Sequence, residues 1–128
     1  SVSTSGDSGP YLLYIVARFK SILGKSTLTG QGNELYIPEV MEPAERDLIV
    51  SLGEFDTALM LSVEKRDPSH IAQYLFELSQ AANHFYHECP VLNAAEPTQE
   101  FRLALIEKVV HTMERGFDLL GITTVEHM

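Results

Sequence analysis

Several side chains in this sequence are of types that carry out chemistry, and their spacing decides whether they can act together. Gly24, Lys25, Ser26 and Thr27 resemble the end of a phosphate-binding loop. That motif also requires a glycine five residues before Gly24, where this chain has Phe19, and it lies between a strand and a helix. Here the segment follows a predicted helix, so we interpret it as a plain helix end.

Three residues near the middle of the chain, His84, His87 and Cys89, are of the types that bind metals. A tetrahedral site needs three or four converging ligands, and His111 or His127 would have to complete the set. His84 and Cys89 are five residues apart, so on one helix their side chains point in different directions. We therefore predict no metal site and no catalytic residue, and we interpret Cys89 as a buried, inert thiol rather than a nucleophile.

Another group of residues has the chemistry of binding. Tyr11, Tyr14 and Arg18 are spaced by three and four residues, so they share one face of a helix beside its apolar stripe. Lys25 would extend the same line if the helix ran that far. Aromatic rings next to an arginine suit stacking on unpaired bases and holding a phosphate. From the spacing alone, we favour the interpretation that the two tyrosines are rim residues of the core and that Arg18 is a surface charge.

Length and composition set the frame for these residues. The 128 residues suffice for one domain with one core, and 9 basic against 18 acidic residues give a net charge of −9. That charge argues against coating nucleic acid through phosphates, so any RNA contact must be local, and we expect no DNA partner. No apolar run is long enough for a membrane span, so we expect no membrane partner. The single cysteine and the absence of a secretory signal favour the cytoplasm.

The apolar spacing predicts an all-α helical bundle. Four helices are expected, at about residues 10–23, 43–65, 68–89 and 98–120, with Gly53 marking a possible break in the second. Pro10 suits the first helical position, and Gly121 suits a helix end. Residues 1–9 are interpreted as a flexible lead-in or a cloning remnant, and residues 10–128 as the domain. The inward residues expected on the second and third helices are Leu48, Ile49, Leu52, Leu59, Met60, Val63, Ile71, Leu75, Leu78, Ala82 and Phe85.

Short segments along the whole chain match the sequence motifs of one protein family. Residues 8–18, SGPYLLYIVAR, are similar to that family's "GPYLQYAHAR", and residues 45–49, ERDLI, to its "ERxLI". Residues 68–92 resemble "P..la.YL.dLa..fN.fY...pVl". Residues 102–105 and 116–128 are similar to "RLaL" and to the ending "GL.LLGI..pe.M". Each segment is a weak signal alone, but the ordered set covers the chain from about Asp7 to Met128. The chain therefore resembles the C-terminal domain of arginyl-tRNA synthetases.

The resemblance implies a helical anticodon-binding domain of a class I aminoacyl-tRNA synthetase. In that family the domain docks the anticodon stem-loop of arginine tRNA, while a separate Rossmann-type domain, using ATP and magnesium, activates arginine. Neither the "HIGH" nor the "KMSKS" signature of that domain occurs here. The resemblance therefore implies a C-terminal portion without cofactors, whose partners are arginine tRNA and its own catalytic domain.

The resemblance also implies which residues contact RNA. The positions that match anticodon-loop contacts in the family are Tyr11, Tyr14, Arg18, Tyr86 and Met128, with Asn83 either structural or supporting the contacts. Two positions depart from the pattern, because the family's middle glutamine is Leu13 here and the position before the terminal methionine is His127. We also keep an alternative, that a related helical module serves protein–protein contacts, which the acidic charge favours.

Overall fold

Helices form all the regular structure that the computed structural model describes, which comprises residues 2–26 and 36–121, with side chains from residue 9 onward. The helices are α1 (Val2–Lys25), α2 (Pro43–Gly53), α3 (Phe55–Lys65), α4 (Ser69–Glu88) and α5 (Thr98–Leu120). The predicted all-α class is thereby confirmed. No helix of the described residues is long and apolar enough to cross a membrane.

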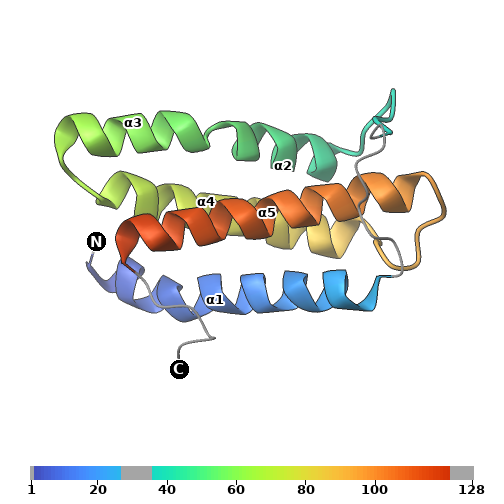
Figure 1. Ribbon diagram of the computed structural model, residues 1–128, viewed down its shortest axis with the longest axis horizontal. Helices are drawn as coiled ribbons and strands as arrows, with labels where there is room; N and C mark the ends of the chain where they lie inside the picture. The colour runs from blue at the N-terminus through green and yellow to red at the C-terminus, as the bar shows by residue number, and fades with distance from the viewer. Residues whose placement is uncertain (1, 27–35, 122–128) are drawn as a thin grey trace.

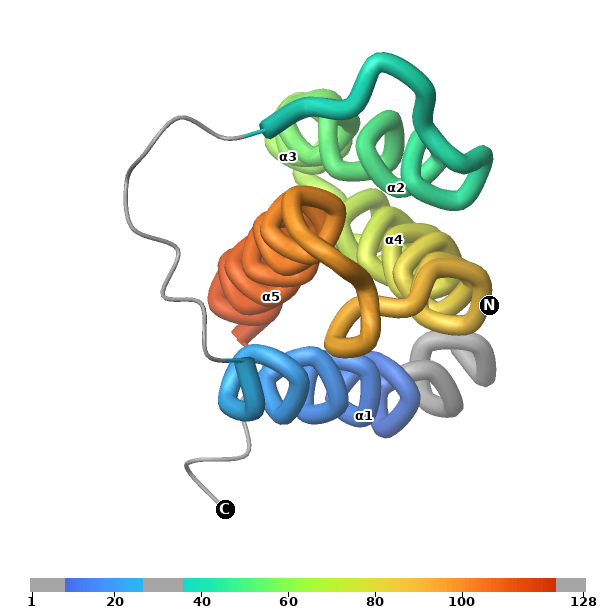
Figure 2. The backbone as a smooth tube through the Cα atoms, turned by 90° about the vertical axis from the view of Figure 1, so that its right-hand side faces the viewer, coloured from blue at the N-terminus to red at the C-terminus, as the bar shows by residue number. Residues whose placement is uncertain are grey.

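The helices are arranged in three layers (Figures 1 and 2). Helices α4 and α5 lie in the middle, α1 covers one side of them, and α2 with α3 covers the other. Figure 1 shows that α1 and α4 run in one direction while α2, α3 and α5 run in the opposite one. Because α4 and α5 are covered on both sides, their buried residues form most of the centre of the core. The largest fully buried side chains include Phe19, Phe85, Phe117, Leu75, Leu78 and Met113.

Helix α1 begins earlier than its sequence pattern predicts. We expect a start at Pro10, but the helix begins at Val2 and contains Pro10 in its interior. One of the clashes of a helical proline is with the Cβ and N–H of the residue before it, and this clash is reduced here because Gly9 has no Cβ. The missing N–H costs one intrahelical hydrogen bond without forcing the helix to begin there. The division into residues 1–9 and 10–128 stays a prediction.

The second predicted helix is two helices, α2 and α3, as Gly53 suggests. Glu54 adopts φ −92° and ψ 0°, and its N–H donates to the carbonyl oxygen of Ser51 over 3.1 Å. The break rotates the face of α3 that meets the core, so that Phe55 and Ala58 are its buried residues. The prediction that Met60 and Val63 face inward is consequently wrong, because 56% of Met60 and 63% of Val63 is exposed.

Helices α4 and α5 follow their predictions closely. The carboxylate of Asp67 accepts a hydrogen bond from the N–H of Ser69 (3.0 Å) at the start of α4, and this bond lowers the pKa of Asp67. All five residues predicted on the α4 stripe are buried. Gly121 ends α5 with φ 76°, a conformation that a residue without Cβ adopts easily.

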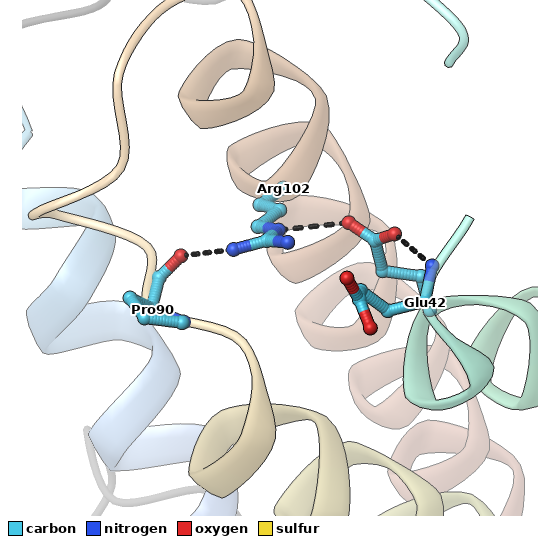
Figure 3. A network of polar contacts seen from close by, with 4 residues as sticks. Glu42, Pro90 and Arg102 are labelled. Carbon is cyan, nitrogen blue, oxygen red and sulfur yellow. Dashed lines mark hydrogen bonds and ion pairs between the residues drawn. The ribbon is translucent and has the colours of Figure 1, made fainter. Parts of the chain in front are cut away.

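A buried polar network joins α2, α5 and the loop between α4 and α5 (Figure 3). The Nε of Arg102 donates to Glu45 over 2.7 Å, and its Nη1 donates to the carbonyl oxygen of Pro90 over 2.7 Å. The other carboxylate oxygen of Glu45 accepts from the N–H of Glu42 (2.8 Å). Only 3% of the Glu45 side chain and 12% of the Arg102 side chain is exposed. One arginine therefore fixes the start of α2 and the end of α4 relative to α5.

Candidate nucleic-acid interface

The candidate site lies along the seam between α1 and α4, which run side by side in the same direction (Figure 1). Residues that meet across this seam differ by 65 in number. Tyr11 of α1 packs near Phe76 of α4, and Arg18 contacts Asn83. The parallel register therefore brings residues from two distant parts of the sequence into one row.

Arg18 is at the centre of this row. Its Nη1 donates a hydrogen bond to Oδ1 of Asn83 over 3.1 Å, and its Nη2 donates to the hydroxyl of Tyr14. Its Cζ lies 4.5 Å from the centroid of the Tyr14 ring and 4.2 Å from that of the Tyr86 ring. Both separations are within the range of cation–π attraction. Four of the six predicted RNA-binding residues, Tyr14, Arg18, Asn83 and Tyr86, thus form one cluster.

The cluster combines exposed rings with a rigid base. Of its two tyrosines, Tyr14 is 53% exposed and Tyr86 is 37% exposed. Their helix neighbours Ile15 and Phe85 are fully buried, so the backbones that carry the rings are fixed by the core. The rings are therefore accessible, and the backbone positions that carry them are fixed by the core.

The other two predicted residues are placed differently. Tyr11 is half-buried one turn before Tyr14, and its ring lies 6.3 Å from that of Phe76. This tyrosine fits the interpretation as a rim residue of the core better than Tyr14 does. Met128 lies outside the described residues.

His87 is a neighbour of the cluster that sequence reasoning considered only as a metal ligand. Its ring lies 5.2 Å from that of Tyr86 in an edge-on orientation. The only feature of the sequence that could have indicated this contact is the position of His87 directly after Tyr86. Both His84 and His87 are exposed, whereas Cys89 is buried as predicted, and burial raises the pKa of its thiol. Among the described residues no three His, Cys, Asp or Glu side chains lie close enough to hold a metal ion.

Gly24 and Lys25 occupy the last turn of α1. The segment that resembles a phosphate-binding loop therefore begins in the end of a helix, in line with its interpretation as a plain helix end, and α1 stands where such a loop requires a strand.

Comparison with known proteins identifies the family of this chain. The family described as the DALR anticodon binding domain matches residues 12–128. The chain belongs to this family. Its five described helices are therefore those of a DALR domain, and the Tyr14–Arg18–Tyr86 cluster lies on that domain's α1–α4 seam.

The relatives of this DALR domain include arginine–tRNA ligases. That of Prochlorococcus marinus is 41% identical over 128 residues, a match that covers 99% of this chain and 21% of that protein. That of Bdellovibrio bacteriovorus is 40% identical over 124 residues, covering 96% and 21%. The solved structure of Thermus thermophilus arginyl-tRNA synthetase superposes with a TM-score of 0.78 at 36% identity, covering 94% of this chain and 21% of that one. The DALR domain thus spans about a fifth of the length of these relatives.

The cluster on the DALR domain is suited to binding rather than to bond making. Two half-exposed aromatic rings offer faces on which an unpaired base stacks. A guanidinium has five N–H donors, and only two of those of Arg18 are used within the described structure, so the others can meet acceptors on a phosphate or a base edge.

Proposed function

We propose that this chain is the anticodon-binding part of an arginine–tRNA ligase and that it docks the anticodon stem-loop of arginine tRNA. The observation that carries the proposal is the exposed cluster of Tyr14, Arg18 and Tyr86 in a chain of the DALR family. Aminoacylation with ATP and magnesium is then the work of a catalytic domain of the same ligase. That domain and the tRNA are the proposed partners, and the reducing cytoplasm is the proposed location.

In this proposal the anticodon loop meets the α1–α4 seam with its bases unstacked. One base stacks on the exposed face of Tyr14 or Tyr86, and Arg18 donates charge-assisted hydrogen bonds to a base edge or a phosphate. Asn83 acts through Arg18, because its Oδ1 accepts one of the guanidinium hydrogens. Tyr11 and Met128 are further proposed contacts.

The net charge of −9 supports a small interface. Phosphates approaching most of the surface are repelled, so stacking and a few directed hydrogen bonds must supply the affinity. The fully buried helix neighbours of the two tyrosines support this, since a backbone that the core holds in place loses less freedom when a base binds.

A second candidate function is a protein–protein contact through α2 and α3. Val50, Met60 and Val63 are more than half exposed on these helices, which lie on the side of the bundle opposite α1. Met60 and Val63, three residues apart, share one face of α3, and exposed apolar side chains on one face suit a protein partner.

A titration separates the two candidates. The chain is mixed at fixed salt with the anticodon stem-loop of an arginine tRNA and, as a control, with a stem-loop of the same length carrying an unrelated anticodon. Tighter binding of the arginine stem-loop supports the proposed function. Equal binding of both RNAs, or none, together with capture of a protein by the Met60 and Val63 surface, would favour the second candidate.

A further inference from the structure

Most of helix α1 in this acidic chain carries basic residues without any acidic ones. Residues 8–26, which include most of α1, carry three of the nine basic residues and none of the 18 acidic ones. The three are Arg18, Lys20 and Lys25. Because the rest of the chain is strongly acidic, α1 is the helix to which a polyanion is drawn.

These three residues do not share one face. Seven residues separate Lys25 from Arg18, which rotates Lys25 by only about 20° and moves it about 10 Å along the helix. Lys20 is two residues from Arg18 and thus rotated by about 200°. Its Nζ lies 2.6 Å from the carboxylate of Glu114 on α5, so it faces the other neighbour of α1.

The structure meets the condition under which Lys25 joins the row of Tyr14 and Arg18, since α1 continues to Lys25. Lys25 is exposed, and it makes no ion pair within the part of the chain that the structure describes. Its ammonium is therefore available to an external anion, two helical turns beyond the aromatic cluster.

We infer that the line from Arg18 to Lys25 is a phosphate track along which the RNA backbone leaves the aromatic cluster. The inference rests on the proposed function and adds a direction to it. The bound RNA runs from the Tyr14–Tyr86 cluster toward the C-terminal end of α1, and Lys25 contacts one backbone phosphate there. Lys20, on another face, takes no part.

Paired lysine variants test this track, because Lys25→Gln and Lys20→Gln each remove one positive charge from the same helix. Dissociation constants for the arginine anticodon stem-loop are measured over a series of salt concentrations. For Lys25→Gln we expect a roughly five- to tenfold weaker complex near 0.1 M salt and a salt-dependence slope smaller by about 0.7–0.9, the range for one phosphate of a single strand or a duplex. For Lys20→Gln we expect a change of less than about twofold, because charges on the far face are screened at this salt concentration.

Two further measurements keep the outcome decisive. Lys25→Arg keeps the charge and should restore both affinity and slope, and thermal melting should show that all variants are folded. Equal effects of Lys25→Gln and Lys20→Gln, with wild type binding normally, would overturn the phosphate track alone. Failure of the wild-type chain to bind the stem-loop at low salt would overturn the proposed function together with it.

Discussion

The guanidinium of Arg18 on α1 donates a hydrogen bond to the side-chain oxygen of Asn83 on α4, 65 residues later in the chain. The same guanidinium lies against the rings of Tyr14 and Tyr86. The Arg18 side chain thus links α1 and α4 at the surface of the bundle, outside the core that packs the two helices together. The consequence is that the proposed binding groups already hold fixed relative positions in the free protein.

Replacing Tyr14 with alanine should weaken binding of the arginine anticodon stem-loop by roughly 1–3 kcal/mol if a base stacks on its ring. The matched control is Tyr36→Ala, which removes another exposed tyrosine from the segment that precedes α2. Fluorescence titration at fixed salt measures both. An unchanged dissociation constant for Tyr14→Ala would remove this residue from the site.

Glu45→Ala should destabilise the fold by about 3 kcal/mol, because it leaves Arg102, whose side chain is only 12% exposed, without its ionic partner. The control is Glu114→Ala, which breaks an ion pair with Lys20 whose side chains are both more than a third exposed. Such a pair contributes less than about 1 kcal/mol. Urea unfolding compares the two variants, and equal losses would contradict the role assigned to the Arg102 network.

Gly116→Ala should destabilise the bundle by about 1–3 kcal/mol, although alanine is the better helix former. A Cβ on Gly116 of α5 would lie 2.6 Å from Cδ2 of Leu75, which is fully buried on α4 and has little room to move. The same change at Gly24 meets no described atom within 4 Å, so it should be neutral or stabilising by up to about 1 kcal/mol. Thermal melting of the two variants gives the comparison, and a stabilised Gly116→Ala chain would show that α4 and α5 can separate without cost.

Tyr74→Phe should lower the free energy of unfolding by about 1 kcal/mol near neutral pH, since the hydroxyl of Tyr74 donates to the carbonyl oxygen of Ser51 over 2.7 Å. Burial, with the nearby carboxylates of Glu54 and Asp56, raises the pKa of this phenol. The folded state therefore keeps its proton more tightly than the unfolded chain, whose tyrosines ionise near pH 10.

The stabilisation from Tyr74 is fully present below about pH 10 and is lost as the pH rises toward the higher pKa of the folded state. Wild type should consequently lose stability more steeply than Tyr74→Phe between about pH 9.5 and 11. Urea midpoints measured across this range test the sign, and parallel curves for the two chains would be inconsistent with a raised pKa.

The amino-acid sequence determined most of the helices, because their signals are local. The period of apolar residues in α4 and α5, the proline and aspartate before α4 and Gly121 after α5 act within a few residues, and the structure follows them. The break at Gly53 was visible for the same reason. The exposed Met60 and Val63 were not foreseen, since the face that α3 buries depends on how the chain turns at Glu54.

The same division applies to the candidate site. Spacing placed Tyr14 and Arg18 on one face of one helix, and the family resemblance named Asn83 and Tyr86 without a geometry. Only the tertiary structure decided that these four residues meet, because a contact across 65 residues depends on the parallel packing of α1 against α4. Local patterns carry no information about that register, which is set by the apolar surfaces that the helices bury together.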